Sequence, residues 1–187
     1  MLYRDGPVLV TGTLPVAGDH VTNDLSLGLR VTTAQAELLK LRWARGTTQT
    51  RDKGDKVWLN GDASFGDRQL PKMAIETISA ARTLELLEVV KQKLGPAFAP
   101  EHCGAGVILT GGTSRMPGIE EAASRVFGLP ARRGEPPSWV KDELKDPMFS
   151  TVLGVFQFGL RGAHEHALPQ RRRPGLLSNL TRIFATS

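Results

Sequence analysis

The sequence is poor in cysteine and has no long hydrophobic run. Its single cysteine, Cys103, cannot form an internal disulfide, and with the neighbouring His102 it falls short of a zinc-ligand set. No segment approaches the ~18 consecutive apolar residues of a membrane-spanning helix, and residues 1–6 lack the basic and apolar regions of a signal peptide. We therefore expect a cytoplasmic protein with neither a metal site nor a transmembrane helix.

Most of the chain also lacks excess charge. The formal net charge is +5, but five arginines against one glutamate from Arg161 onward account for +4, which leaves +1 for residues 1–160. A protein that wraps a nucleic acid needs a surplus of cations to neutralise phosphates. Since the body of the chain has no such surplus and no basic face studded with aromatic residues, nucleic acid is the least favoured partner.

Short β-forming runs alternate with helical runs along the 187 residues, and 40% of the residues are hydrophobic. This alternation predicts an α/β sheet with helices on its faces, interrupted between residues 30 and 100 by a smaller segment. The expected elements are a hairpin over 2–13, helices over 19–29 and 34–43, a polar, mobile loop over 46–54, strands over 57–61 and 67–70, a long helix over 71–94, a strand over 106–109, a helix over 117–127, a strand over 129–132 and a buried helix over 146–160.

The stretch VILTGGTSRMPGI, residues 107–119, places two adjacent glycines between an expected strand and an expected helix. Glycines at such a junction allow close backbone approach, so Gly111, Gly112 and Thr113 could present a flat surface to a nucleotide. The stretch fits neither the phosphate-loop pattern with its lysine nor the dinucleotide-binding pattern. A tight turn that only packs a helix onto a sheet explains the glycines equally well.

Four stretches in this order resemble actin-like ATPases, and most closely the bacterial FtsA family: AGDHVTNDLSLGL, AELLKLRW, VILTGG followed by MPG, and DPMFSTVLGVFQFGL. The resemblance implies an α/β fold, the second lobe of an actin-like (ribonuclease H-like) fold with an inserted smaller α+β subdomain. It implies a subdomain IIA lacking its first strand over 1–29 and 100–161, an inserted subdomain IIB with a long connecting helix over 30–99, a basic linker over 162–173 and an amphipathic membrane-targeting helix over 174–187.

The same resemblance implies an adenosine site. Gly111, Gly112, Thr113 and Met116 would lie against the adenosine, while Glu37 and Lys40 would reach the ribose from the inserted subdomain. A carboxylate can accept hydrogen bonds from ribose hydroxyls, so the residue types fit these roles. From the residues alone, Glu37 and Lys40 are equally a charge pair at i, i+3 on a solvated helix face.

The chain departs from the family pattern at its start. Full-length members bind ATP with Mg²⁺ through phosphate loops and a metal-holding aspartate, and none of these motifs occurs in this sequence. We therefore expect weak or absent ATP binding, no catalytic residue and no working ATPase in this chain alone.

A partner site follows from the resemblance as well. Arg82 and Glu85 match an R-x-x-E pattern on the long helix that lines the family's site for the acidic C-terminal peptide of FtsZ, the tubulin-like division protein. An arginine can pair bidentately with a carboxylate of such a peptide. The alternative is a pair between Arg82 and Glu85 on the helix surface.

The last residues carry a second targeting signal. On a helical wheel of about 100° per residue, five apolar side chains fall within an arc of roughly 120°, preceded by three arginines that suit anionic headgroups. Such a stripe is also compatible with a core helix. We expect it to attach the protein to the cytoplasmic face of the plasma membrane, through the arginines Arg171, Arg172 and Arg173 and the apolar residues Leu176, Leu177, Leu180, Ile183 and Phe184.

These expectations combine into a cell division adaptor that tethers FtsZ filaments to the membrane, with possible self-association into filaments. Two other interpretations stay open. A PilM-like protein of type IV pilus assembly shares much of this lobe but ordinarily lacks the terminal amphipathic helix. A fragment of a sugar-kinase-like ATPase would need the absent catalytic lobe.

Overall fold

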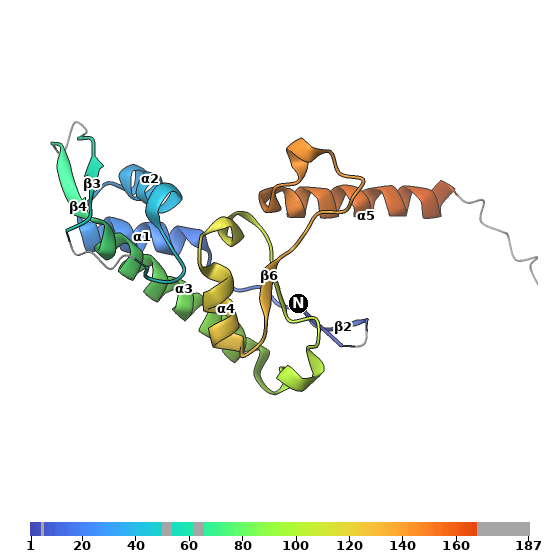
Figure 1. Ribbon diagram of the computed structural model, residues 1–187. Coiled ribbons are helices and arrows are strands. Elements are labelled where there is room, and N and C mark those ends of the chain that lie inside the picture. Colours follow the sequence, from blue (N-terminus) through green and yellow to red (C-terminus); the bar gives the residue numbers. More distant parts are fainter. Residues whose placement is uncertain (5, 50–53, 62–65, 168–187) are drawn as a thin grey trace, which may run out of the picture. The chain divides into compact units, whose positions relative to one another are not determined.

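The computed structural model describes residues 1–4, 6–49, 54–61 and 66–167 (Figure 1). It comprises two compact units, one formed by Met1–Ser150 and one beginning at Thr151. The first unit opens with the predicted hairpin, in which β1 (Leu2–Tyr3) pairs antiparallel with β2 (Val8–Val10). Gly6 takes the positive φ of 105° that the turn requires.

Three helices and a second hairpin follow, close to the predicted bounds. They are α1 (Gly18–Leu29), α2 (Thr33–Trp43), the antiparallel pair β3 (Lys56–Leu59) and β4 (Arg68–Pro71), and α3 (Lys72–Leu94). Local chemistry explains the ends. The Thr32 hydroxyl caps α2 by accepting from the Gln35 amide at 3.3 Å, and Gly95 ends α3 with a positive φ.

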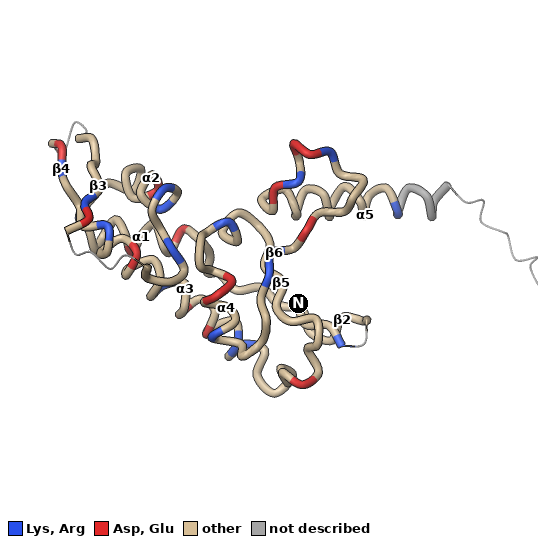
Figure 2. Tube along the Cα trace, viewed as in Figure 1, with Lys and Arg blue, Asp and Glu red and all other residues tan. Residues whose placement is uncertain are grey.

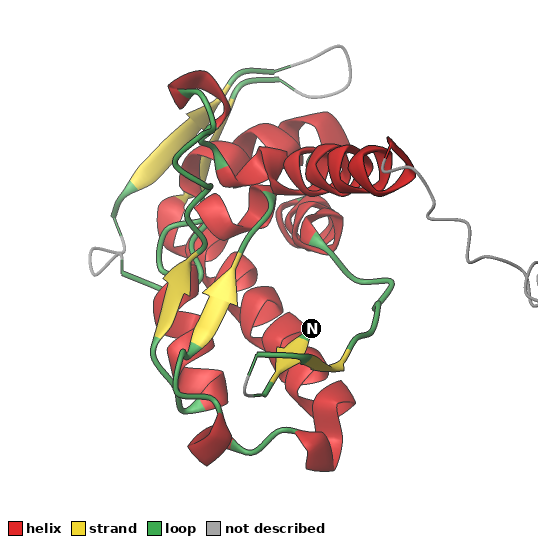
Figure 3. Cartoon of the chain, turned by 90° about the vertical axis from the view of Figure 1, so that its right-hand side faces the viewer, coloured by secondary structure: helices red, strands yellow, loops and turns green. Residues whose placement is uncertain are grey.

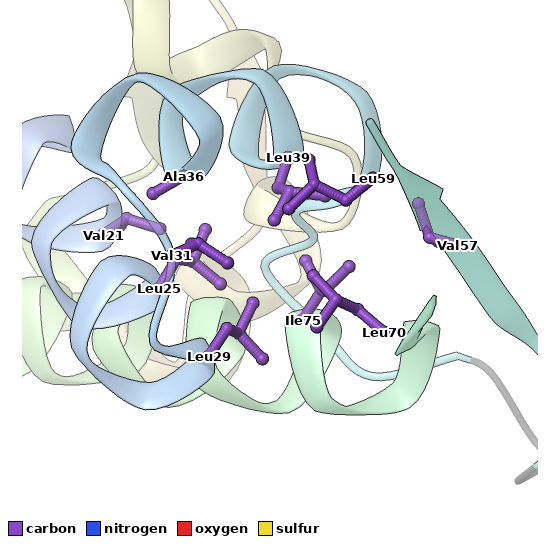
Figure 4. Close-up of a cluster of buried hydrophobic side chains, with 10 residues drawn as sticks. All are labelled: Val21, Leu25, Leu29, Val31, Ala36, Leu39, Val57, Leu59, Leu70 and Ile75. Atoms are coloured by element: carbon purple, nitrogen blue, oxygen red, sulfur yellow. The ribbon is translucent and has the colours of Figure 1, made fainter. Parts of the chain in front are cut away.

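One hydrophobic cluster holds these elements together (Figure 4). Its members are Val21, Leu25, Leu29, Val31, Ala36, Leu39, Val57, Leu59, Leu70 and Ile75. Three of them lie on α1, which therefore shares its core with the inserted segment. The boundary that we expected at residue 30 stays a prediction.

One side of α2 is buried and the other is open to solvent. Leu39 is buried, while its neighbour Leu38 is 51% exposed. The core meets α2 along the line of Ala36 and Leu39. The Trp43 ring instead contacts the Lys72 ammonium, whose Nζ lies 5.5 Å from the centroid of the ring.

The remaining part of the first unit is a parallel strand pair with one helix. β5 (Val107–Leu109) pairs parallel with β6 (Ala131–Arg133), and α4 (Ile119–Phe127) connects them (Figure 3). Gly128 ends α4 with a positive φ of 69°. The three strand pairs of the described chain form separate two-stranded sheets, so the continuous sheet that we expected is not present among the described residues.

The second unit is described as far as the end of α5 (Ser150–Ala167). The Asp146 side chain caps a short 3₁₀ turn, Pro147–Phe149, that precedes the helix. The prediction of a buried helix is wrong, because Val155 and Phe158 are 68% and 81% exposed. Residues 162–167 continue the helix, and residues 168–187 lie outside the described residues.

Candidate functional site

The glycine turn between β5 and α4 has the open surface that a ligand needs. Gly111 has a φ of 87°, a conformation that favours glycine. A Cβ added at Gly111 or at Gly112 would meet no heavy atom within 4 Å. Thr113, in the following 3₁₀ turn Gly112–Arg115, is exposed beside them. The three residues therefore form an accessible edge that a flat ring system could approach.

Three contacts hold this turn in place. The Gly111 amide donates to the Pro147 carbonyl at 3.1 Å, and the Ser114 hydroxyl donates to the Gly111 carbonyl at 2.7 Å. Arg115 Nε lies 3.4 Å from Asp146 Oδ2. The backbone of the turn is thus tied to the 3₁₀ turn before α5, which limits its movement.

Met116 faces the helices more than it faces the open edge. Its side chain is half-buried and packs against the hydrophobic cluster, and its sulfur lies 3.5 Å from the Thr83 hydroxyl oxygen on α3. The role that we expected for Met116 against the adenosine stays a prediction. Its contacts in the structure make it the link between the turn and α3.

Glu37 and Lys40 of α2 form an ion pair at 2.7 Å, but they do not form it alone. The buried Thr22 hydroxyl on α1 donates to Glu37 Oε2 at 2.6 Å and accepts from Lys40 Nζ at 2.8 Å. One hydroxyl can serve a carboxylate and an ammonium together because it is both a donor and an acceptor. Thr22 therefore orients both groups that were expected to reach a ribose.

This arrangement sets the ionisation of Glu37. Burial raises its pKa, but hydrogen bonds from Lys40 and Thr22 and the positive charge of Lys40 outweigh burial, so the pKa of Glu37 lies below its ordinary value of 4.5. Glu37 is therefore a carboxylate near neutral pH. Its side chain is 42% exposed, which leaves it accessible to a ligand hydroxyl.

Gly18, the first residue of α1, joins the two halves of the site. A Cβ at Gly18 would lie 2.7 Å from Thr113 Oγ1 and 3.8 Å from Lys40 Nζ, and Lys40 also donates to the Gly18 carbonyl at 3.4 Å. The structure thus brings Thr113 and Lys40 to the same end of α1. The contact also explains why this position has no side chain, because a methyl group would displace Thr113.

The residues expected to bind a partner have partners within the chain. The Arg82 guanidinium pairs bidentately with Asp24 of α1, through Nε at 2.5 Å and Nη2 at 2.9 Å. Its Nη1 lies 2.8 Å from Glu85 Oε2. The hydrogen bond to Asp24 raises the pKa of Arg82 above its already high ordinary value. The expected R-x-x-E pair is therefore formed, and Asp24 is a third member.

The sequence did not single out Gly18, Thr22 and Asp24. All three lie in the AGDHVTNDLSLGL stretch, which we identified by resemblance as a whole. Their contacts reach α2, α3 and the glycine turn, and no spacing within the stretch indicates those contacts. The residues expected to meet a membrane, from Arg171 to Phe184, lie outside the described residues.

A sequence model of the family described as "Cell division protein FtsA" matches residues 1–154. The chain belongs to the FtsA family. The FtsA of Pseudomonas aeruginosa is 32% identical over 162 residues, which cover 86% of this chain and 39% of that protein. The FtsA of Neisseria meningitidis is 33% identical over 157 residues, 82% of this chain and 38% of that protein. This FtsA-family chain thus spans about two fifths of the length of these relatives.

Solved structures agree on the fold. MreB5 of Spiroplasma citri bound to ADP superposes with a TM-score of 0.63 and 16% identity, over 86% of this chain and 50% of MreB5. The structure of MreB5 of Spiroplasma citri bound to AMPPNP also superposes with a TM-score of 0.63, over 87% of this chain. The likeness confirms a partial actin-like lobe, as expected from the FtsA resemblance.

Proposed function

We propose that this chain acts in bacterial cell division as an FtsA-type adaptor, which tethers FtsZ filaments to the cytoplasmic face of the plasma membrane. The meeting of Glu37 and Lys40 with Thr113 around Gly18, in a chain whose residues 1–154 match the FtsA family, carries this proposal. Segments far apart in the sequence come together there, as an actin-type nucleotide lobe needs. Tethering requires a partner site and a membrane site in addition.

The residues present fit the adenosine end of a nucleotide. The open edge at Gly111 and Gly112 leaves room for a ring system, and the Glu37 carboxylate offers an acceptor for ribose hydroxyls. Lys40 could donate to a ribose hydroxyl by releasing the Gly18 carbonyl, which is its longest contact at 3.4 Å. ATP with Mg²⁺ would supply a conformational signal in a full-length protein. In this chain we propose weak binding without hydrolysis, because the sequence has no phosphate loop.

The partner site that we propose is the α1–α3 surface around Arg82. The Arg82 side chain is 26% exposed and its guanidinium has donors left after its three intramolecular contacts, so a carboxylate of the FtsZ tail can reach it. Leu27, one turn after Asp24 on α1, is 70% exposed and offers apolar contact beside the charges. This combination suits a peptide with both acidic and apolar residues.

The membrane site that we propose is the C-terminal segment, with its three arginines and apolar stripe. The helices among the described residues include none that is long and apolar enough to cross a membrane. A segment of five apolar residues is a weak anchor, so stable attachment calls for several copies along a filament. Self-association of the chain is therefore part of the proposal.

The proposal is tested by recruitment of FtsZ to vesicles. FtsZ polymerised with GTP is mixed with vesicles containing anionic lipid, with and without this chain, and the vesicles are collected by flotation. We expect FtsZ to float with the vesicles only when the chain is present. Flotation of the chain without FtsZ would refute tethering, and flotation of neither would refute membrane attachment as well.

A further inference from the structure

We propose that Asp24 is a further determinant of the partner site, because its carboxylate competes internally for Arg82 and must release it when an acidic partner segment binds. The inference rests on the proposed function, in which Arg82 receives a carboxylate of the partner. It assigns to α1 a role in setting how strongly α3 binds that partner.

The geometry shows how fully Arg82 is engaged. Of its five N–H donors, Nε and one hydrogen on Nη2 point to Asp24 at 2.5 and 2.9 Å, and one hydrogen on Nη1 points to Glu85 at 2.8 Å. The bidentate pair with Asp24 is the same arrangement that an incoming carboxylate would seek. An incoming carboxylate therefore meets Arg82 with its best-oriented face already occupied.

The local charge also opposes an acidic segment. Asp24 and Glu85 carry two negative charges against the single positive charge of Arg82, so the cluster as a whole is negative. A like charge at an interface slows and weakens the binding of a segment of the same sign. Neutralising Asp24 by Asp24→Asn removes one negative charge and one of its two acceptor oxygens, so it frees at least one Arg82 donor.

The pair is nevertheless one that a partner can open. The side chains of Arg82 and Asp24 are 26% and 24% exposed, so water and a ligand reach both. Access to solvent lowers the cost of opening the pair, because water can solvate the separated groups. Release of Arg82 is thus a modest cost that a peptide with several contacts can overcome.

The test measures binding of a fluorescein-labelled C-terminal peptide of FtsZ to the full chain by anisotropy. We expect Asp24→Asn to tighten binding about two- to fivefold, because the competing charged pair with Arg82 is lost. Glu85→Gln should give a smaller gain in affinity for the peptide, because Glu85 makes one contact with Arg82 and Asp24 makes two. Glu88→Gln, one turn further along α3, is the matched control: it removes the same charge from a residue that does not touch Arg82, and it should leave binding unchanged.

Arg82→Ala distinguishes failure of the competition between Asp24 and the partner from failure of the partner site itself. Loss of binding in Arg82→Ala, together with no gain in Asp24→Asn or in Glu85→Gln, would overturn the competition and leave the proposed site standing. Unchanged binding in Arg82→Ala would overturn the partner site itself. The double variant Asp24→Asn with Arg82→Ala should bind no better than Arg82→Ala alone, and a gain there would assign the effect to general charge. Circular dichroism of each variant checks that the helix content of the chain is unchanged.

Discussion

The amide of Gly46 donates a hydrogen bond of 2.8 Å to the carbonyl of Pro117, and the two backbones touch at this point. A Cβ at Gly46 would lie 2.7 Å from the Ile119 Cα and 2.8 Å from the Gly118 carbonyl carbon. Gly46 and Thr47 are both buried, so this part of the loop after α2, which we expected to be mobile, is packed against the start of α4.

Gly46→Ala should destabilise the protein by about 1–3 kcal/mol, the usual cost of forcing atoms into a packed site. The neighbouring atoms belong to backbone, which cannot move aside cheaply. Urea unfolding followed by circular dichroism measures the change. Gly12→Ala is the matched control, because a Cβ at Gly12 meets nothing within 4 Å, and it should be neutral or slightly stabilising. Equal midpoints for the two variants would show that the contact is not tight.

The low pKa of Glu37 predicts a specific loss of stability in acid. A carboxyl group whose pKa is lowered in the folded state stabilises that state above its unfolded pKa, and the contribution disappears as the pH falls through the folded pKa. Folding stability should therefore decrease as the pH is lowered below 4.5, the ordinary value for Glu37.

Thr22→Val removes the hydroxyl that donates to Glu37, so the pKa of Glu37 should move upward. The share of folding stability that Glu37 loses in acid should then become smaller. Titration of the Glu37 carboxyl carbon by NMR reports the pKa directly. Thr22→Ser keeps the hydroxyl and should restore the low pKa. An unchanged Glu37 titration in Thr22→Val would show that Lys40 alone sets the pKa.

Nucleotide binding should be weak, with a dissociation constant on the order of millimolar, because only adenosine contacts are available. Chemical-shift changes on addition of ATP should cluster at Gly111, Gly112 and Thr113. Lys40→Ala should remove them, whereas Lys56→Ala, on the exposed face of β3, should not. Micromolar affinity that depends on Mg²⁺ would contradict the expectation that this chain lacks phosphate-binding groups.

Arg82→Glu should weaken binding of the FtsZ peptide by roughly 2 kcal/mol or more, because a repulsive pair replaces an attractive one. The substitution also places a third carboxylate beside Asp24 and Glu85, so a lower melting temperature is expected. Arg42→Glu, an exposed charge reversal on α2, is the control and should affect neither quantity strongly. An unchanged affinity in folded Arg82→Glu protein would remove Arg82 from the partner site.

The C-terminal segment should bind vesicles through its apolar stripe. Removing residues 174–187, or combining Leu177→Glu with Phe184→Glu, should abolish co-sedimentation with anionic liposomes, and added salt should weaken it because each arginine contributes about 1 kcal/mol at the membrane surface. Ser178→Glu with Thr181→Glu adds the same charge to the polar face and should retain part of the binding. Equal sedimentation of the truncated and intact chains would rule out the membrane tether.

The sequence by itself determined the local elements and the family. The Thr32 cap, the Gly95 and Gly128 stops and the two hairpins followed from interactions between residues a few positions apart, and such interactions can be read in order along a chain. The ordered motifs likewise led to FtsA without coordinates. The expected ion pair of Arg82 with Glu85 is local in the same way.

Only the tertiary structure decided which of these elements meet. Asp24 pairs with Arg82 across 58 residues of sequence, and Thr22 serves Glu37 and Lys40 from a different helix. The packing of α1 into the insert and the close contact at Gly46 arise in the same manner. A polar or glycine residue has many possible long-range partners, and the choice among them depends on how the helices pack around one shared core, which no spacing along the chain contains.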